Sequence, residues 1–392
     1  MGLRGKLLAT FISLSLVSLF ADVIYEGARS IGGAYLNFLT APAIAVSILG
    51  LGEFLSNLMR FLGGVLAQRM ASGRAYWSLI FFGYLVNLAI PCLAFTGSWE
   101  IAIILFLIER IGKGLRAPAR DVILSELTDE AKRGRWFGLH ELMDQIGAIA
   151  GPAIIGAAIY VSKPLEAGYR LAFNLLWIPI IMMIVMLLSA YVNYPRPKAV
   201  SVATEEKGLK GLDKRFWSYL IGSIFTLLGF IYWGVIAYYA QDAVKAGILM
   251  AEEVPILYLI AMAVDAVIAL PIGLLYDRVG LKSVVLAPLT AISITPALFM
   301  IKGRIGLYLA SIPWGLTMGI IETIMRASVA DIAPIEVRSL AYGIYSSSIG
   351  FAWFTGSLIM AYMYQVGLIN AIIILTIILE AAALTTYAVT LR

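Results

Sequence analysis

The 392-residue sequence has very few of the residues that carry metal, redox and hydrolytic chemistry. Cys92 is its single cysteine and His140 its single histidine. One cysteine excludes an internal disulfide, and one histidine excludes a histidine-rich metal site. Hydrolytic enzymes need an activated nucleophile or a metal site, yet neither a His-Glu-x-x-His nor a Gly-x-Ser-x-Gly motif occurs. We therefore expect no enzyme activity, no metal and no cofactor.

Charge is also scarce. Charged residues make up 14% of the sequence and hydrophobic residues 61%, against about 25% and about 45–50% in soluble domains. A compact soluble fold cannot bury so much apolar side chain, whereas a bilayer solvates it on every outer face. The sequence therefore predicts an integral membrane protein. The net charge of +5 is better explained by orientation in the lipid bilayer than by binding to nucleic acid.

Apolar runs separated by short polar turns predict an all-α protein with twelve transmembrane helices in two groups of six. The runs cover residues 8–36, 43–67, 75–96, 99–121, 136–161, 169–193, 216–240, 253–276, 282–301, 305–330, 339–364 and 368–390. The polar segment 194–214, which contains proline and glycine, is typical of a linker. We therefore predict an N-terminal bundle over 1–193 and a C-terminal bundle over 215–392.

The basic residues between the predicted spans indicate the orientation. Seventeen of them fall on the side of the amino terminus and five on the opposite side. Because cytoplasmic loops carry the excess of lysine and arginine, this ratio predicts that both termini are cytoplasmic. We expect a monomer in the plasma membrane.

The two halves resemble each other at matched offsets. Residues 24–27 correspond to 231–234, Gly64 to Gly273, and Gly138 and Gly151 to Gly343 and Gly356. Two pseudo-symmetric six-helix bundles around a central cavity are typical of secondary transporters, which hold their substrate near the midplane of the membrane.

The predicted spans and the turns that follow them contain three glycine-rich or basic motifs. The run 136–161 contains Gly138, Gly147, Gly151-Pro152 and Gly156; the run 99–121 contains Arg110, Lys113, Gly114 and Ala117. At the end of the eighth run and after it come Gly273, Asp277, Arg278, Gly280 and Lys282; at the end of the second run and after it comes a degraded copy, Gly64, Gln68, Arg69, Gly73 and Arg74. With these motifs the sequence resembles the major facilitator superfamily over essentially its whole length, and most closely its drug:proton antiporter branch.

The resemblance implies that some of these residues control conformational change. Gly147 and Gly151 leave room for close helix approach and Pro152 bends the span, so that an interface with a helix of the second half tightens or parts. The loop motifs imply tight cytoplasmic turns that hold neighbouring helix ends. The expected gating residues are Arg69, Arg74, Gly147, Gly151, Pro152, Asp277, Arg278, Gly280 and Arg338.

Charged residues inside the spans are costly, so each is expected to face the interior and to have a partner. Asp22, Glu26 and Arg29 share one face of the first span, and Glu109 and Lys113 share one face of the fourth. We predict a proton-coupling network of Asp22, Glu26, Arg29, Glu109, Arg110, Lys113 and Asp144, with Asp22 as first choice for the proton carrier. The alternative for each is a permanently paired structural ion.

The second half has fewer charges and more aromatic residues, which predict a pocket for a flat hydrophobic or cationic molecule. The candidate substrate-binding residues are Tyr25, Glu53, Asn57, Tyr232, Trp233, Tyr239, Asp265, Trp314 and Tyr345. Glu380, in the last span, is expected to face outward near the membrane surface.

These observations predict an alternating-access, proton-coupled exporter of a small hydrophobic or cationic molecule. An uptake symporter or facilitator of a small metabolite shares the same fold and charges, and only the motif of the fifth span separates the two. An intramembrane enzyme lacks the residues it needs. A receptor that binds without transporting does not explain the duplicated halves.

Overall fold

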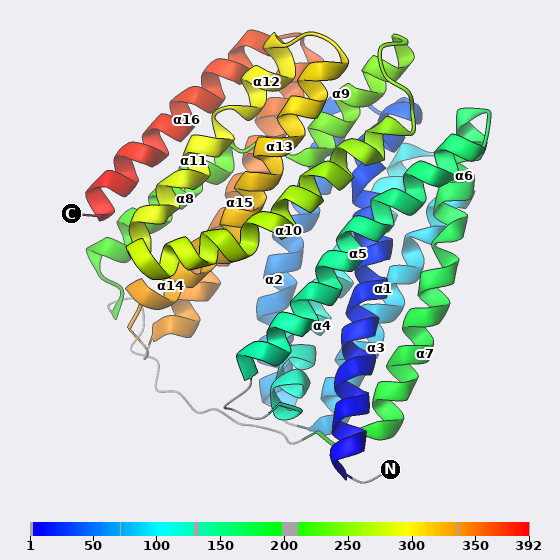
Figure 1. The fold of residues 1–392 in the computed structure, drawn as a ribbon, viewed down its shortest axis with the longest axis vertical. Helices are drawn as coiled ribbons and strands as arrows, with labels where there is room; N and C mark the ends of the chain where they lie inside the picture. Colours follow the sequence, from blue (N-terminus) through cyan, green and yellow to red (C-terminus); the bar gives the residue numbers. More distant parts are fainter. Residues whose placement is uncertain (1–2, 71, 129–132, 198–210, 335–336, 392) are drawn as a thin grey trace. The chain divides into compact units, whose positions relative to one another are not determined.

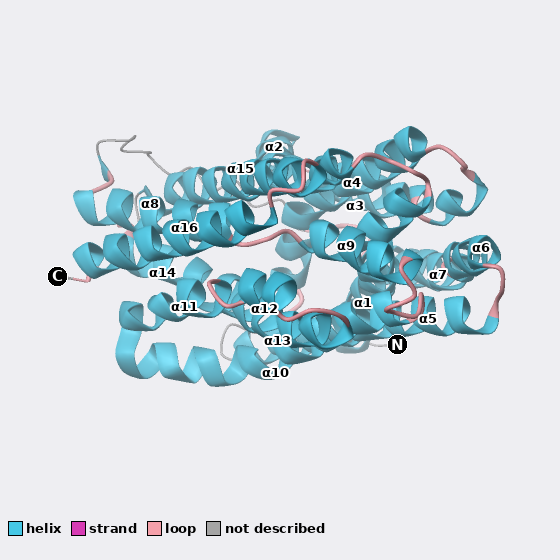
Figure 2. Cartoon of the chain, turned by 90° about the horizontal axis from the view of Figure 1, so that it is seen from above, coloured by secondary structure: helices cyan, strands magenta, loops and turns pink. Residues whose placement is uncertain are grey.

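The computed structural model describes residues 3–70, 72–128, 133–197, 211–334 and 337–391, and within these ranges the chain is helical and contains no strand (Figures 1 and 2). The elements are α1 (Leu3–Phe38), η1 (Ala43–Val46), α2 (Ser47–Met70), α3 (Gly73–Leu85), η2 (Val86–Ala89), η3 (Pro91–Phe95), α4 (Trp99–Glu126), α5 (Arg133–Val161), α6 (Leu165–Leu175), α7 (Trp177–Asn193), α8 (Lys214–Gly229), α9 (Trp233–Lys245), α10 (Glu253–Val279), η6 (Gly280–Val285), α11 (Leu286–Ala291), α12 (Ile294–Met300), α13 (Arg304–Ile320), η7 (Ile321–Met325), α14 (Arg326–Ile332), α15 (Arg338–Gln365) and α16 (Ile369–Thr390).

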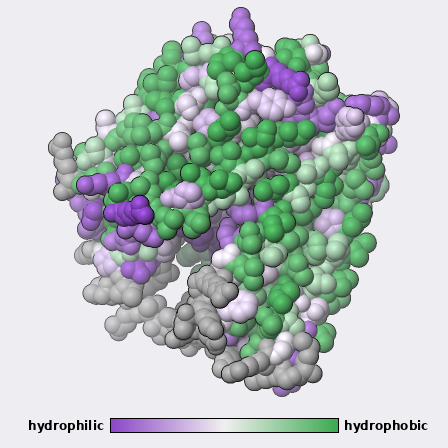
Figure 3. All heavy atoms as spheres, in the orientation of Figure 1, coloured by the Kyte–Doolittle hydropathy of each residue, from purple (hydrophilic) through white to green (hydrophobic). Residues whose placement is uncertain are grey.

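Long apolar helices account for most of this fold. Nine helical stretches of the described residues are long and apolar enough to cross a membrane, and one of them, Glu253–Met300, has 48 residues, which is enough for two crossings. Large apolar side chains such as Ile178, Ile181 and Val185 of α7 are exposed. Figure 3 shows such hydrophobic residues, in green, over much of the visible surface. A bilayer, rather than water, is the solvent that suits these helix faces.

The chain divides into two compact units. The first contains residues 1–30 and 55–203, and the second contains residues 31–54 and 204–392. Helices α1 and α2 thus contribute residues to both units. The centre of the predicted linker, residues 198–210, lies outside the described residues, so the linker stays a prediction.

In the first unit the backbones of α1 and α5 lie in contact at glycines. A side chain on Gly151 would overlap the carbonyl oxygen of Val23, and a Cβ on Gly147 would lie 3.0 Å from the Cβ of Asp22. The same contact recurs in the second unit, where a side chain on Gly356 would overlap the carbonyl oxygen of Leu228. Both residues of this second pair lie 205 positions after their counterparts. The duplication expected from the sequence is therefore present in the packing.

The partner of the α5 glycines differs from our expectation. Gly147 and Gly151 face α1 within the first unit, whereas the motif predicted an interface with a helix of the second half. Small residues on α5 and Gly27 on α1 leave room for this approach. Pro152 follows the contact inside α5.

Residues 230–232 interrupt the predicted span 216–240. Helix α8 ends at Gly229 and α9 begins at Trp233, with Phe230 and Tyr232 in extended conformations between them. An interrupted helix leaves carbonyl groups without helical partners, which is costly in a membrane interior. Here Trp353 Nε1 donates to Phe230 O at 3.1 Å, and Trp314 Nε1 donates to Ile231 O at 3.0 Å. Two tryptophans distant in sequence thus replace the missing helical bonds.

A π-helical turn lies within the predicted span 305–330. Helix α13 passes through this turn, η7, into α14. Beyond the turn, Asp331 accepts a hydrogen bond of 2.5 Å from the Tyr276 hydroxyl near the end of α10. This bond joins the ends of α10 and α14 within the second unit.

Tyr194, the residue after α7, joins three helices of the first unit by hydrogen bonds. Its hydroxyl donates to Glu126 Oε2 at 2.9 Å, and its carbonyl accepts from Trp77 Nε1 at 3.0 Å. Burial and the bond to Glu126 raise the pKa of Tyr194 to about 12. Helices α3, α4 and α7 are tied together at this residue.

The two indole donors at the α8–α9 interruption predict a stability effect. Replacing either Trp314 or Trp353 by Phe leaves a buried carbonyl without its donor, and we expect a loss of about 1–3 kcal/mol. Thermal unfolding in detergent, followed by the midpoint temperature, measures this loss. Trp217→Phe is the matched control because Trp217 is 39% exposed on α8. A midpoint shift no larger than that of the control would contradict the assigned function of the two indoles.

Candidate functional site

The first unit gathers three cationic side chains around the ring of Tyr25. The guanidinium carbon of Arg110 lies 3.1 Å from the ring centroid, the amine of Lys113 4.1 Å, and the guanidinium carbon of Arg29 5.6 Å. Arg110 and Lys113 are three residues apart on α4, so they project on the same side of that helix. Cation–π attraction makes the aromatic ring a favourable neighbour for these charges. The sequence placed Tyr25 among the substrate residues, and the structure puts it at the centre of the charged cluster.

Two acids form close pairs with cations of this cluster. Glu109 accepts a hydrogen bond of 2.6 Å from Arg110 Nε, and both side chains are buried. Glu26 lies 3.7 Å from Arg29 one turn along α1. Such pairing offsets the cost of burying charge. The predicted partnership of Glu26 with Arg29 is therefore present, and Arg110 has Glu109 as its partner.

Asp22 forms the most open pair of the cluster. Its Oδ1 lies 3.9 Å from Lys113 Nζ, and the two side chains are 17% and 35% exposed. The backbone of α5 lies directly beside it, because a Cβ on Gly147 would touch the Cβ of Asp22. An accessible acid with a long ion-pair distance, placed on a helix–helix contact, is suited to exchanging a proton when the helices move.

Asp144 has a partner that the sequence analysis did not name. On α5, His140 Nε2 lies 3.9 Å from Asp144 Oδ2. The other histidine nitrogen, Nδ1, lies 3.2 Å from the Ser15 hydroxyl. The sequence analysis did not pair His140 with Asp144, and the signal that could have found this pair is its spacing of four residues on one helix face.

The basic residues beyond Lys113 on α4 have different partners. Arg116 donates to Gly83 O of α3 at 2.9 Å and covers the ring of Tyr84. Arg120 donates to the Ser18 hydroxyl at 2.8 Å and pairs with Asp121 at the same distance. Arg116 therefore joins α4 to α3, and Arg120 reaches α1.

The remaining candidates in the first half lie on α2. Glu53 and Asn57 are both half-buried. They are one turn apart, and their assignment to substrate stays a prediction.

The aromatic candidates of the second unit fall into separate groups. Trp233 lies against Tyr258 at 4.7 Å and against Trp314 at 5.0 Å between ring centroids, and both tryptophans are fully buried. Tyr232 contacts Trp353 in the same group. Tyr239 instead lies beside Phe299 and Tyr364, and Tyr345 stacks on Tyr219. The structure thus joins Tyr232, Trp233 and Trp314 around the α8–α9 interruption and separates Tyr239 and Tyr345 from them.

The two acids expected in the second half are both buried. Asp265 of α10 lies beside Gly319 of α13, where a Cβ would come within 2.8 Å of its Oδ1. Glu380 is completely buried on α16, so the prediction that it faces outward is wrong. Thr376, Glu380 and Tyr387 fall at helical spacing on the buried face of α16, and this polar stripe is the signal that could have placed Glu380 inside.

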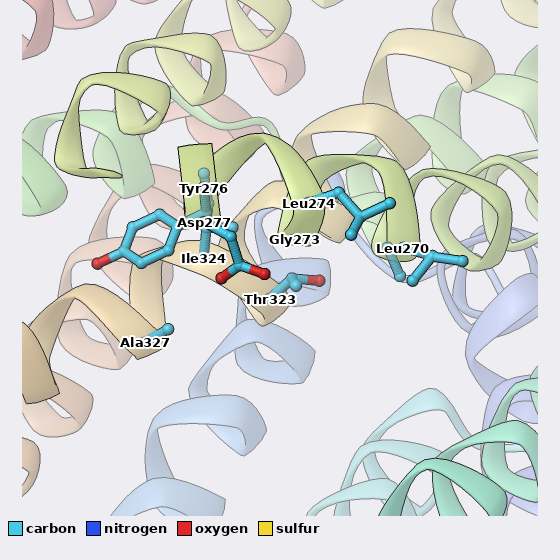
Figure 4. A pocket seen from close by; sticks show the side chains of 9 residues that line it. Leu270, Gly273, Leu274, Tyr276, Asp277, Thr323, Ile324 and Ala327 are labelled. Carbon is cyan, nitrogen blue, oxygen red and sulfur yellow. The ribbon is translucent and has the colours of Figure 1, made fainter. Parts of the chain in front are cut away.

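The gating candidates outside α5 lie at or near helix ends. Arg69, Arg74, Asp277 and Arg278 are exposed, and Arg338 begins α15. Gly280 ends α10 with φ +62°, a conformation that favours glycine. Gly273 and Asp277 line a pocket of about 250 Å³ between α10 and the η7–α14 segment (Figure 4). In this region the bond from Tyr276 to Asp331 joins the helix ends, and the sequence analysis missed it.

A polar cluster at the end of the second unit was also missed. Asn37 Nδ2 donates to Asp242 Oδ1 at 2.8 Å, and Lys245 Nζ donates to the Asn37 side chain. The Tyr364 hydroxyl donates to Asp242 Oδ2 at 2.7 Å. These residues come from α1, α9 and α15, so only the folded structure brings them together.

The described residues contain no group of three or more histidine, cysteine or acidic side chains able to hold a metal ion. The chemistry available to the first unit is exchange of protons and ions among carboxylates, amines and guanidinium groups. The second unit provides aromatic side chains and buried acids, among them Asp265 and Glu380.

The charged cluster around Tyr25 predicts different effects for two substitutions. Tyr25→Phe keeps the π face, whereas Tyr25→Leu removes it and should destabilise the protein by roughly 1–2 kcal/mol more. The midpoint of thermal unfolding in detergent compares the two variants. Equal midpoints for both variants would show that the cations gain nothing from the ring.

Comparison with known proteins agrees with this fold. The chain matches the family model described as Major Facilitator Superfamily over residues 7–250 and 220–392. An uncharacterized protein of Mycobacterium tuberculosis is 33% identical over 377 residues, covering 94% of this chain and 89% of that protein. An uncharacterized MFS-type transporter of Methanocaldococcus jannaschii is 27% identical over 323 residues, covering 81% of this chain and 78% of that protein.

Solved structures share the architecture at low sequence identity. The nucleoside transporter NupG superposes with a TM-score of 0.77 at 15% identity, covering 96% of this chain and 99% of that chain. A peptide transporter POT in complex with sulfate gives a TM-score of 0.76 at 15% identity, with coverage of 97% and 93%. The chain belongs to the major facilitator superfamily and is a multi-pass membrane transporter, not an enzyme.

Proposed function

We propose that the protein is a proton-coupled secondary transporter that exports a small hydrophobic or cationic molecule by alternating access. In this proposal the plasma membrane holds a monomer with both termini in the cytoplasm, and the proton carrier is Asp22. The observation that carries the proposal is the open Asp22–Lys113 pair beside the α1–α5 contact.

The ion pairs around Asp22 favour it over the other acids as the proton carrier. Glu109 is buried, and its Oε2 accepts a hydrogen bond of 2.6 Å from Arg110, so this acid has a close cationic partner. Asp22 has a longer ion-pair distance and an exposed fraction of 17%. Water reaches a group of this kind more readily than a buried pair, and a proton needs such access.

Movement of α5 relative to α1 couples this acid to conformation. Because the Asp22 Cβ lies against Gly147, a shift of α5 that moves α1 relative to α4 changes the distance from Asp22 to Lys113. Separation from the amine favours the protonated acid, and approach favours the ion pair. The acid is thereby loaded in one conformation and unloaded in the other.

Two features support the proposed direction of transport and the proposed class of substrate. The glycines of α5 match the antiporter-like motif of the sequence, which favours export over uptake. The buried aromatic group at the α8–α9 interruption would offer its π faces to a flat or cationic molecule once this segment opens, and Asp265 provides a buried acid within the same unit. Discontinuous membrane helices often mark substrate sites in transporters.

The deciding experiment measures solute movement in sealed proteoliposomes of known orientation with an imposed pH gradient. The probes are lipophilic dye cations, neutral hydrophobic compounds and sugars. We expect movement of a lipophilic probe opposite to protons. Movement with protons would favour an uptake symporter, and equal movement without a gradient would favour a facilitator.

Asp22→Asn tests the proton carrier in the same assay. The amide cannot exchange a proton, so we expect the variant to fold and bind the probe but to lose gradient-driven movement. Glu166→Gln is the matched control because Glu166 forms an exposed ion pair with Arg170 on α6, remote from the charged cluster. Gradient-driven transport by Asp22→Asn at the level of this control would remove Asp22 from the mechanism.

A further inference from the structure

The second unit contains a carboxyl group that the proposed mechanism does not use. Glu380 of α16 is 0% exposed, and neither of its carboxyl oxygens has a hydrogen-bond partner among the described residues. A membrane transporter rarely retains an ionisable group inside a helix bundle without a function. The surroundings of this group indicate which function it has.

The carboxyl group lies against the end of α8, which runs beside α16 (Figure 1). A Cβ on Gly229 would overlap Oε1 of Glu380 and lie 3.0 Å from its carboxyl carbon. Gly229 is the last residue of α8, directly before the interruption. The absence of a side chain at this position therefore creates the space that the acid occupies.

The end of α8 is an unfavourable place for a negative charge. The carboxyl end of a helix carries partial negative charge on its last carbonyl groups. One turn before Glu380, Thr376 donates its hydroxyl to Gly229 O at 3.4 Å, so a neighbouring donor is already used. A neutral carboxyl group costs far less here than an unpaired carboxylate.

No cation compensates the acid from the neighbouring elements. Tyr387, two turns further along α16, interacts electrostatically with Glu380 but bonds to Ser223. The other ionisable side chains on elements packed against α16 are Lys214, Arg215 and Tyr219 on α8, Lys282 on η6, and Arg338, Tyr342, Tyr345, Tyr362 and Tyr364 on α15. None of them donates a hydrogen bond to Glu380 in the described part of the chain. Lys214 and Arg215 begin α8, at the end of the helix opposite Gly229.

We propose that Glu380 is a proton-binding site of the second unit, protonated while its carboxyl group lies against Gly229. Residues 230–232 are buried, and the carbonyl groups of Phe230 and Ile231 accept hydrogen bonds from Trp353 and Trp314 instead of from helical partners, so water reaches the acid only when this segment opens. When this segment opens, the proton passes from the carboxyl group to water. The part of this site in transport rests on the proposed proton coupling, but its protonation is measurable without any substrate.

Infrared difference spectroscopy of the full-length protein in lipid tests the site. A protonated carboxyl group has a carbonyl-stretching band that a carboxylate lacks. At neutral pH we expect this band in the wild type, its loss in Glu380→Gln and its retention in Glu166→Gln. Glu380→Asp keeps the acid and should shift the band, which keeps the test valid if the amide variant folds poorly.

The pH dependence separates a proton-binding site from a packing residue. We expect the wild-type band assigned to Glu380 to disappear as the pH is raised to the alkaline limit at which the protein stays folded. A band that persists over this range would overturn the proposal, because a permanently neutral group exchanges no proton. Identical wild-type and Glu380→Gln spectra would overturn it as well, because Glu380 would then be ionised.

Hydrogen exchange of the amides in residues 230–235 tests the link to the interruption. At the alkaline end of the titration, the wild type should exchange these amides several-fold faster than Glu380→Gln at the same pH. Equal rates would contradict the link. These readouts are independent of Asp22→Asn in the transport assay, so failure of the proposed function and failure of this site give different results.

Discussion

The contact between the backbones of α1 and α5 is the constraint on which the charged site depends. Gly147 and Gly151 let the two helices approach until the Asp22 Cβ lies against α5. Three cations from α1 and α4 then surround Tyr25, and two of them are paired with Glu26 and Glu109. A larger residue at either glycine would push α1 away from α5 and so displace Asp22, Tyr25 and Arg29, which α1 contributes to the charged site.

The two units share one helix–helix contact and differ in the side chains around it. Gly356 meets Leu228 as Gly151 meets Val23. In the first unit α1 continues as a helix through Tyr25, which is surrounded by charges. In the second unit the chain leaves helical geometry at the corresponding Tyr232, and indole groups stabilise the backbone. The two units thus share one helix–helix contact, but charged side chains surround it in the first unit and aromatic side chains lie beside it in the second.

The sequence predicted an all-helical membrane fold, the duplication and the pairing of Glu26 with Arg29, because each follows from hydrophobic runs, from matched offsets or from helical spacing. It predicted neither the interruption after Gly229 nor the burial of Glu380. Residues 230–232 are apolar and contain no proline, and their partners Trp314 and Trp353 are more than 80 positions away. In a membrane protein the interior and the lipid are both apolar, so hydrophobicity alone does not give the rotation of a helix such as α16.

The π-helical turn at Ile321–Met325 has a consequence for comparing relatives. A π turn arises when one additional residue is accommodated within an α-helix, and each residue rotates the following side chains by about 100°. Asp331 follows the turn and meets Tyr276 only in this rotation. Relatives in which this helix is α-helical throughout are therefore one residue shorter here, and a sequence alignment with them needs a single gap between α13 and α14.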